Sequence, residues 1–168
     1  SYSCSRLSPH IAFGSVSIRE IYQKLLRELE ITGYKKDLNS FKKRLYWHCH
    51  FIQKLESEPE LEFYSMHPMA DGLRPDVNNE VIEKWILGET GFPFLDACIQ
   101  YLRKGGWINF RMRAMLVSFF THHLWQPWKA GVVFLANNFL DFEPGIHYSQ
   151  FQMQAGETGI NMIRIYNP

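Results

Sequence analysis

One stretch decides the fold of this chain: Gly106-Trp107-Ile108-Asn109-Phe110-Arg111-Met112-Arg113-Ala114-Met115-Leu116-Val117-Ser118-Phe119-Phe120. It predicts a helix that is apolar on nearly every side, with Arg111 and Arg113 near its start. A helix of this kind belongs in the middle of a domain and not on its surface. Because arginine is rarely buried without an anionic partner, we expect a carboxylate or a bound anion beside Arg111 or Arg113.

The composition predicts a folded domain without an overall excess of charge. A chain of 168 residues, 46% hydrophobic and 15% aromatic, is long and apolar enough to form one domain with its own core. The high aromatic share also leaves rings that could line a site. The formal net charge is only +1, so nucleic-acid binding would have to come from a local basic patch.

The cysteines and the chain ends bear on location. Cys4, Cys49 and Cys98 lie far apart with no CxxC pair, which disfavours a zinc ribbon or a disulfide framework and suits a reducing compartment. There is no apolar run of about 18 residues and no signal peptide. We therefore expect a cytoplasmic protein with no membrane partner. Because the chain starts without methionine and stops directly after an apolar segment, we also expect residues 1–168 to be one domain of a longer protein.

Helix-start signals mark the first third of the chain. Ser8-Pro9 predicts a short helix capped by Ser8 and ending near Gly14. Ser17 and Glu20 form a capping box that begins the next helix.

A third helix is predicted to begin at Ser40, which could cap it. Lys42, Lys43 and Arg44 would then lie near its positive end, where the helix dipole disfavours them. They either face an anionic partner or form a solvated basic face, which is the commoner case.

The remaining segments predict further helices around one long loop. Residues 56–79 hold three prolines and no sustained period, which indicates a loop of functional length. Helices are expected over 81–88, 93–105 and 127–140, beside the central stretch. From Asp141 onward prolines and glycines break the pattern. A strand is possible there on period alone, but we favour a loop lining a site, because the chain offers no second strand to pair with it. The predicted class is all-α, with several helices packed at varied angles.

Two groups of residues could carry chemistry. Ser5-Arg6-Leu7-Ser8 places hydroxyls, a cation and free backbone N–H groups at a helix start, which can bind phosphate, although most such helix starts bind nothing. Arg113 and Asp141 are natural ion-pair partners. They could simply lock two helices together, or they could line a cofactor cavity with Glu143.

Histidines and tryptophans have ordinary structural explanations as well. His48 and His50 are two apart on a helix and point to different faces, so no metal site is predicted from them. His122 and His123 are adjacent in the sequence and do not predict a metal site either. Trp85 and Trp128 lie on separate predicted helices. Core packing is the default for both, and electron hopping between indoles is the functional alternative.

Several blocks of this sequence, in order, resemble the photolyase/cryptochrome family. They cover nearly the whole chain: Cys4-Ser5-Arg6-Leu7-Ser8-Pro9 with Ala12-Phe13-Gly14, Trp85 with Gly88-Glu89-Thr90-Gly91-Phe92-Pro93-Phe94-Leu95-Asp96-Ala97, Gly106-Trp107 with Arg111-Met112-Arg113, Trp128 with Gly131, and Arg164-Ile165-Tyr166-Asn167-Pro168. The resemblance implies the C-terminal helical domain that holds FAD non-covalently in a folded-over shape. An α/β domain with the antenna chromophore would precede Ser1, and final helices would follow Pro168.

The resemblance also implies a set of FAD-binding residues. Ser5 to Ser8 would meet the phosphates, and Arg113 would pair with Asp141 beside the isoalloxazine ring. His147 would face the reactive nitrogen of the flavin. The expected cofactor residues are Cys4, Ser5, Arg6, Leu7, Ser8, Phe41, His48, Trp107, Phe110, Arg113, Asp141, Phe142 and Glu143.

The activity implied first is that of a DNA photolyase, a carbon–carbon lyase. Reduced, light-excited flavin would pass an electron to a pyrimidine dimer flipped out of damaged DNA. The residues expected to face DNA are Arg44, Trp47, Phe51 and Met153, in a protein expected to be monomeric. A close alternative is a cryptochrome-type blue-light receptor without repair activity. A third is a helical scaffold that no longer binds flavin.

Departures from the family pattern shift the weight between these alternatives. Arg44 stands where repair enzymes place a glutamate that contacts the lesion, His48 replaces an arginine and Phe110 replaces an asparagine. Trp85 and Trp128 match the outer two members of the tryptophan chain that reduces the flavin, but its inner position is Phe151. Because phenylalanine is much harder to oxidise than tryptophan, we expect this route to be broken or to detour through Tyr148 or Trp125.

Overall fold

The computed structural model describes residues 4–31, 33–160 and 162–168, and within these ranges the chain forms helices and connecting segments but no strand. The all-α class predicted from the sequence is confirmed. The α-helices are α1 (Ser8–Ala12), α2 (Ile18–Ile31), α3 (Lys35–Ser57), α4 (Asn79–Leu87), α5 (Pro93–Gly105), α6 (Phe110–Ser118), α7 (Trp128–Asn138) and α8 (Pro144–Ala155). None of the described helices is long and apolar enough to cross a membrane.

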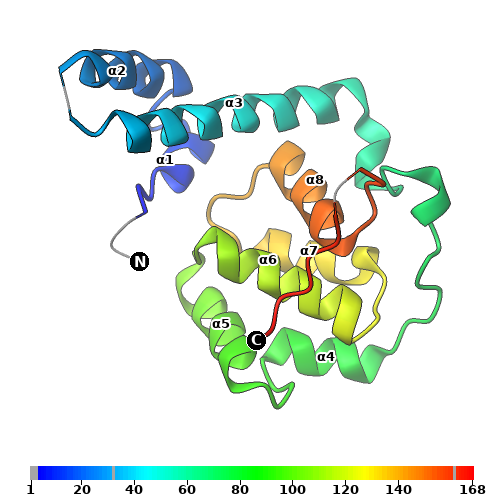
Figure 1. The fold of residues 1–168 in the computed structure, drawn as a ribbon. Helices are drawn as coiled ribbons and strands as arrows, with labels where there is room; N and C mark the ends of the chain where they lie inside the picture. Colours follow the sequence, from blue (N-terminus) through cyan, green and yellow to red (C-terminus); the bar gives the residue numbers. More distant parts are fainter. Residues whose placement is uncertain (1–3, 32, 161) are drawn as a thin grey trace.

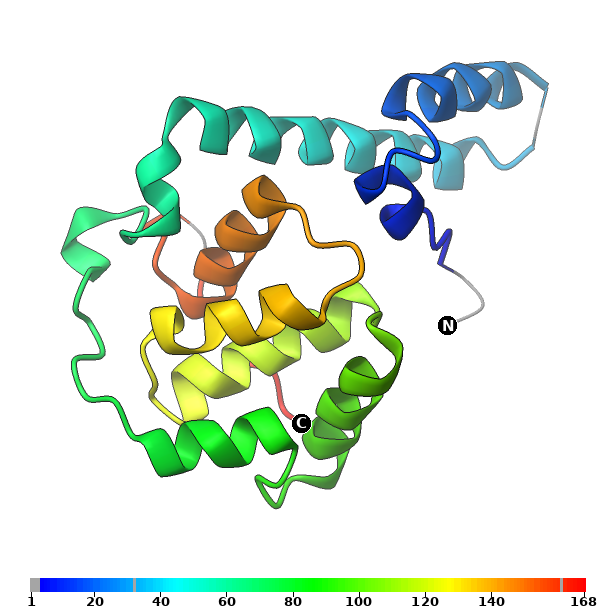
Figure 2. The same ribbon diagram turned by 180° about the vertical axis from the view of Figure 1, so that it is seen from behind.

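Two groups of helices share the long helix α3. Its first half pairs antiparallel with α2, and its second half lies across α8 (Figures 1 and 2). Below α8, helices α4 to α7 form the larger group. The chain from α3 to α4 runs around one side of this group, so α3 connects both groups in space as well as in sequence.

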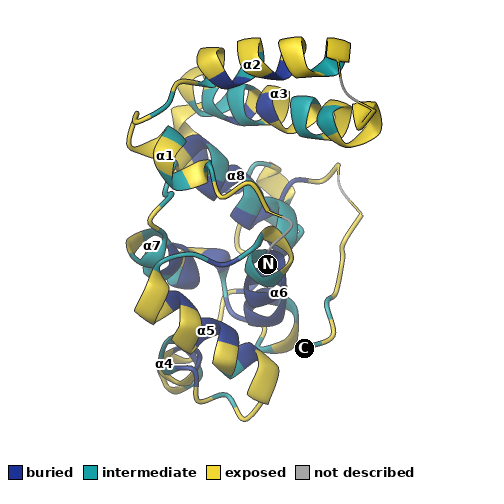
Figure 3. Ribbon diagram, turned by 90° about the vertical axis from the view of Figure 1, so that its left-hand side faces the viewer, coloured by how far each residue is buried: buried dark blue, intermediate teal, exposed yellow. Residues whose placement is uncertain are grey.

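Each group has its own core. In the smaller group, Ile21 and Leu25 of α2 pack against Leu45 of α3, with Leu7 and Ile11 beside them. The larger core lies among the helices α4 to α8. Its fully buried members include Leu95, Ile99, Leu102, Leu116 and Phe120. Figure 3 shows this burial concentrated along the facing sides of α5 to α8, while α2 is exposed on its outer side. The stretch 106–120 does run through the middle of the domain, as predicted.

Most helix boundaries follow their sequence signals. The capping box at α2 is formed, because the Glu20 N–H donates to the Ser17 hydroxyl at 3.1 Å and the Ser17 N–H donates to Glu20 at 2.9 Å. Helix α4 is followed by Gly88 and α5 by Gly106, both in the left-handed conformation that favours glycine. At α1 the cap is Leu7, and the predicted cap Ser8 is instead the first helical residue.

The predicted start of α3 at Ser40 is wrong by five residues, since α3 begins at Lys35. The extra turn forms because Leu38 packs against the α2–α3 core with Phe41, one turn further along. The basic residues after Phe41 therefore lie inside the helix and not at its positive end. The argument that the helix dipole requires an anionic partner therefore does not apply to them. The ammonium group of Lys42 lies 5.6 Å from the centre of the Tyr22 ring.

The loop predicted from Asp141 onward is also wrong in part, because Pro144–Ala155 form helix α8. Pro144 is its first residue and Gly156 ends it with φ = 77°. The helix is buried on several sides, so it lacks the polar face that reveals a helix in a sequence. Gly145 allows the contact with α3, since a Cβ there would lie 2.7 Å from the Phe51 carbonyl oxygen.

The long segment between α3 and α4 is the predicted loop, with two short 3₁₀ turns at Pro59–Glu62 and Pro68–Ala70. Gln152 of α8 anchors it. The fully buried Gln152 amide donates to the carbonyls of Leu61 and Tyr64 and accepts from the Met66 N–H at 2.6 Å. A glutamine that looked like a loop residue in the sequence therefore satisfies three backbone groups that would otherwise be buried without partners.

Helix α6 begins at an Asn109 cap, whose side chain accepts from the Met112 N–H. After Ser118 it continues as a π-helical turn over Phe119–His123, which the sequence did not reveal. Helix α7 begins at Trp128, one residue after the predicted start at Pro127, which is its N-cap, and it ends at Asn138, so Phe139 and Leu140 lie beyond it.

Candidate functional site

Arg113 and Asp141 form the ion pair that the sequence predicted. Two guanidinium N–H groups of Arg113 donate to the two carboxylate oxygens of Asp141, each at 2.9 Å. The Nε of Arg113 donates to the Ile108 carbonyl at 2.8 Å, and the guanidinium lies 4.2 Å from the centre of the Phe139 ring. The Asp141 side chain is 4% exposed, whereas that of Arg113 keeps 23% of its surface. The pair is therefore rigid, charge-compensated and open on the arginine side. The other arginine of the stretch, Arg111, is exposed, so the requirement for an anion falls on Arg113 alone.

The turn at Gly106 helps to bring this pair together. Gly106 ends α5 in the left-handed conformation, and its carbonyl accepts from the Leu140 N–H at 2.9 Å. A Cβ on Gly106 would meet the Leu140 side chain at 2.5 Å, so this close approach also requires glycine. The junction places the start of α6 next to the segment between α7 and α8, which carries Asp141 and Glu143.

The predicted phosphate-binding segment meets Trp107 at the start of α6. The Trp107 indole N–H donates to the Ser8 hydroxyl at 3.2 Å, and the Arg6 guanidinium lies 5.3 Å from the centre of the indole ring. Arg6 has φ = 55°, an unusual left-handed conformation for a residue with a side chain. Cys4, Ser5, Arg6 and Ser8 are exposed, and Leu7 packs in the α2–α3 core. The structure therefore places hydroxyls and a cation beside an aromatic ring, with surface left to meet a ligand.

His48 and Glu143 face each other across the α3–α8 contact. Burial lowers the pKa of His48, and the neighbouring Glu143 carboxylate partly offsets this. The Nδ1 atom of His48 is buried and has no hydrogen-bond partner. A buried polar nitrogen without a partner is unusual and marks a place where a ligand could supply one. Phe110, at the first residue of α6, is 55% exposed and leaves an aromatic face open on the surface.

His147 lies deeper, in the first turns of α8. Its Nε2 pairs with the Val132 carbonyl at 2.9 Å, and Phe142 packs edge-on against its ring at 5.3 Å. Burial lowers the pKa of His147 to about 4. The neutral ring must carry its proton on Nε2 to donate to a carbonyl, which leaves Nδ1 as an acceptor. Among the described residues, no three His, Cys, Asp or Glu side chains gather as a metal site requires.

The residues predicted to face DNA do not all reach the surface. Arg44 is exposed, Trp47 is half exposed, and Met153 is partly buried on α8. Phe51 is only 6% exposed, which contradicts a direct DNA contact. Its ring lies 5.5 Å from the Trp47 ring, so Phe51 supports that tryptophan from within. Phe41, which was predicted to contact the cofactor, is partly buried against the α2–α3 core.

The two tryptophans predicted to carry electrons differ in surroundings. Trp128 is buried with its ring 6.4 Å from that of Phe151, which in turn lies 6.0 Å from His147. Trp85 is fully buried against Phe120 and Phe134. The surroundings of Trp85 are therefore those of a core residue, and its part in a chain of indoles stays a prediction. Trp125 is 51% exposed, with the Arg74 guanidinium 4.8 Å from its ring centre.

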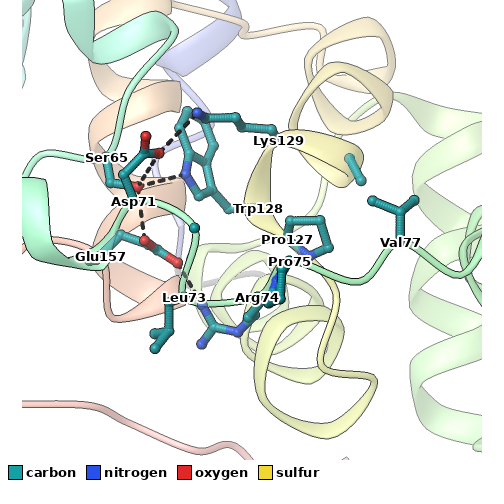
Figure 4. A pocket seen from close by; sticks show the side chains of 13 residues that line it. Ser65, Asp71, Leu73, Arg74, Pro75, Val77, Pro127, Trp128, Lys129 and Glu157 are labelled. Carbon is teal, nitrogen blue, oxygen red and sulfur yellow. Dashed lines mark hydrogen bonds and ion pairs between the residues drawn. The ribbon is translucent and has the colours of Figure 1, made fainter.

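A buried polar cluster beside Trp128 was missed in the sequence. Arg74 and Glu157 form an ion pair of 2.6 Å with side chains only 2% and 3% exposed. Ser65 and Asp71 join them at the wall of a cavity of about 540 Å³ (Figure 4). The members come from the long segment and the end of α8, separated by up to 92 residues. Because they share no motif or spacing, nothing in the sequence brings them together.

The profile of a known domain family matches most of this chain. The family is described as the FAD binding domain of DNA photolyase, and the match covers residues 41–168. Among curated proteins, the deoxyribodipyrimidine photo-lyase of Alkalihalophilus pseudofirmus is 31% identical over 98% of this chain and 34% of its own length. Cryptochrome-2 of Gallus gallus is 34% identical over 75% of this chain and 22% of its own length.

A solved structure supports the same similarity. The archaeal photolyase from Sulfolobus tokodaii, described with two FAD molecules, has a TM-score of 0.85 and 29% identity, over 97% of this chain and 36% of its own. The chain thus spans about a third of the length of the photolyases it matches.

Proposed function

This chain belongs to the photolyase/cryptochrome family, and we propose that it is the FAD-binding domain of a DNA photolyase. In this proposal, light drives an electron from reduced flavin to a pyrimidine dimer in damaged DNA. The observation that carries the proposal is the Arg113–Asp141 pair, which fixes a guanidinium by three hydrogen bonds and still leaves it partly open. An ion pair that only joined two helices would gain no stability from the exposed part of the Arg113 guanidinium.

The residues present fit FAD. The unpartnered Nδ1 of His48, the exposed ring of Phe110 and the exposed hydroxyls and guanidinium at Ser5, Arg6 and Ser8 offer the mixture of groups that a dinucleotide needs. When bound, FAD would supply light absorption and electron transfer. We propose that Ser5, Arg6 and Ser8 hold the diphosphate while Trp107 positions them.

The remaining residues would set the electrostatics. Arg113 provides a fixed positive charge whose partner, Asp141, keeps the site close to neutral overall. His147 remains uncharged at neutral pH because its pKa is about 4, so it offers an acceptor nitrogen and not a second cation. Glu143 and His48 would complete the wall formed by α3 and α8.

DNA would approach along α3. Arg44 and Trp47 are exposed on this helix, and Phe51 holds the Trp47 ring from behind. A guanidinium suits a phosphate contact, and an exposed indole can stack on an unpaired base. Damaged DNA is therefore the proposed partner, although Arg44 is an unusual residue to meet the lesion itself.

Blue-light repair of a defined thymine dimer tests this proposal. The protein containing this chain, loaded with FAD and reduced, should restore the intact bases under blue light and not in the dark. The matched variant is Trp47→Ala, which removes the stacking ring but leaves Arg113, Asp141 and His147 in place. Repair should fall while bound flavin stays constant. Absence of repair by a flavin-loaded protein would contradict the photolyase proposal.

A cryptochrome-type light receptor is the second candidate. It is favoured by Arg44, which stands exposed where the repair enzymes place a glutamate, and by the 34% identity to a cryptochrome. Light-driven reduction of bound flavin without dimer repair, in the same assay, would support it. A third candidate, a helical scaffold without flavin, would be supported if the protein neither retained FAD nor took it up.

A further inference from the structure

A chain of hydrogen bonds leads from the indole of Trp128 to a buried carboxylate. The Trp128 Nε1–H donates to the Ser65 hydroxyl at 3.1 Å, and the Ser65 O–H donates to Oε2 of Glu157 at 2.9 Å. Figure 4 shows the two hydrogen bonds meeting at the Ser65 oxygen, with the indole nitrogen pointing at Ser65. An indole N–H can only donate, while a hydroxyl accepts and donates at once, so the direction of the chain is fixed.

Glu157 is set up to receive a proton at the end of this chain. Its other oxygen, Oε1, is held by Arg74 at 2.6 Å, so Oε2 is the oxygen that faces Ser65. Arg74 is in turn fixed by the carbonyls of Thr121 and Ala155 and by Nδ1 of His122. Burial raises the pKa of the Glu157 carboxyl, which makes it a stronger base than an exposed carboxylate. Asp71, the other carboxylate near Ser65, is more distant at 3.4 Å and is paired with Lys129.

We propose that Ser65 and Glu157 form a proton relay that takes the Nε1 proton of Trp128 when Trp128 is oxidised. Trp128 is buried, so water cannot readily take that proton. The loss of one electron turns neutral indole, a very weak acid, into a radical cation that is a far stronger acid. Ser65 and Glu157 are the groups that lie in the path of the N–H bond.

The step balances in atoms and electrons. One electron leaves Trp128 for light-excited oxidised flavin along a route that bypasses Phe151, so this inference rests on the proposed function. The Nε1–H bond of Trp128 breaks and its proton moves to the Ser65 oxygen, while the Ser65 hydroxyl proton moves to Oε2 of Glu157. The products are a neutral indolyl radical and a protonated Glu157. When an electron returns to Trp128, both protons move back. Ser65 and Glu157 affect the electron transfer only through Trp128, so they are positioning residues and not catalytic residues.

The network could instead do no more than fasten the long segment to α7 and α8. The two roles differ in one measurable way: only a relay controls how fast oxidised Trp128 loses its proton. The conservative variant Ser65→Thr keeps the hydroxyl, and Ser65→Ala removes it. Glu157→Gln keeps the shape but removes the base. Asp71→Asn serves as a matched control, because it neutralises the second carboxylate of the same cavity.

The experiment follows the protonation state of the Trp128 radical by transient absorption, in which radical cation and neutral radical have different spectra. A short ultraviolet flash ionises indoles directly and needs no flavin. Subtraction of the signal of a Trp128→Phe variant isolates Trp128. The relay predicts deprotonation that slows in heavy water, slows about a hundredfold in Ser65→Ala and Glu157→Gln, and is nearly unchanged in Ser65→Thr and Asp71→Asn.

Equal deprotonation rates in the native protein, Ser65→Ala and Glu157→Gln would overturn the relay. A second arm excites bound FAD with blue light and records whether the same Trp128 radical forms. If the ultraviolet arm shows the relay but the flavin-loaded protein repairs no dimer, the relay chemistry stands and the proposed function fails. A missing Trp128 radical under blue light alone means that Phe151 interrupts the route from Trp128 to the flavin. Thermal unfolding of each variant confirms that the rates compare folded proteins.

Discussion

The indole N–H of Trp107 donates a 3.2 Å hydrogen bond to the hydroxyl of Ser8, 99 residues earlier in the chain. This contact links the first residue of α1 to the segment just before α6. It places the Ser8 hydroxyl beside Trp107, which precedes Arg113 in the chain by six residues. The proposed cofactor site therefore combines segments that lie about a hundred residues apart in the sequence, and several of its parts are fixed before any ligand binds.

Stability should fall as the pH drops from about 6.5 to 4, in part because of His147. Its pKa is about 4 when folded, against 6.5 for the ordinary side chain, so the unfolded chain binds the proton more readily in this window. The contribution of the neutral His147 to the unfolding free energy is complete above pH 6.5. Up to about 3 kcal/mol of it is lost as the pH approaches 4. Burial also lowers the pKa of His48 and of His122, which add to the same trend.

Urea unfolding at several pH values checks this. His147→Asn, which cannot titrate there, should flatten the dependence of the unfolding free energy on pH. His10→Asn, at an exposed position, is the control and should leave the slope unchanged. The same slope in His147→Asn as in the native protein would exclude His147 as a source.

Gln152→Leu should destabilise the domain although it makes the core more apolar. The substitution strands the carbonyls of Leu61 and Tyr64 and the N–H of Met66, all of which bind the Gln152 amide. Leaving such groups unsatisfied should lower the unfolding free energy by roughly 3 kcal/mol. Chemical denaturation measures this, and Gln100→Leu, on the exposed side of α5, should cost much less. Faster proteolysis within residues 58–78 should accompany the loss.

Gly145→Ala should disrupt the contact between α3 and α8. The added Cβ would lie 2.7 Å from the Phe51 carbonyl oxygen and 2.8 Å from the Ile52 Cα, and backbone atoms cannot yield as a side chain can. A loss of about 2 kcal/mol is expected from the forced shift. Gly105→Ala is the matched control, because nothing lies within 4 Å of its added Cβ. Equal thermal midpoints for the two variants would show that α8 can move away from α3 freely.

Phe151→Trp should speed the reduction of bound flavin by blue light. Phe151 lies between His147 and Trp128, with ring centres 6.0 Å and 6.4 Å away, and phenylalanine is too hard to oxidise to carry the electron itself. An indole there would complete a route to Trp128. Flash photolysis in the presence of an external reductant measures the rate. Equally fast reduction in the native protein would mean that the electron already bypasses residue 151, for instance through Tyr148 or Trp125.

The sequence was most informative where a local signal had a single physical cause. The capping box at Ser17 and Glu20 and the glycines at 88 and 106 predicted helix ends correctly, because caps satisfy backbone groups within a few residues. The ion pair of Arg113 with Asp141 was also predictable. An arginine in an apolar helix needs an anion, and Asp141 is the first carboxylate after the next predicted helix.

The sequence was least informative where tertiary contacts decided the outcome. Helix α8 looked like a loop because burial on several sides removed its periodicity, and its Gln152 binds a segment about ninety residues away in the sequence. The extra turn of α3 depends on Leu38 meeting the α2 core. Phe51 was assigned a role at a surface that it does not reach. The Ser65–Arg74–Glu157 cluster depends on contacts between segments that no spacing rule connects.

The most direct measurement is the flavin content of the purified protein and its affinity for added FAD. The account predicts that one FAD per protein is released on heating, and that the stripped protein rebinds FAD more tightly than FMN, which lacks the adenylate part of the dinucleotide. Arg113→Ala should weaken this binding strongly. A protein that carries no flavin and binds neither FAD nor FMN in the titration would contradict the claim that these residues form a flavin site.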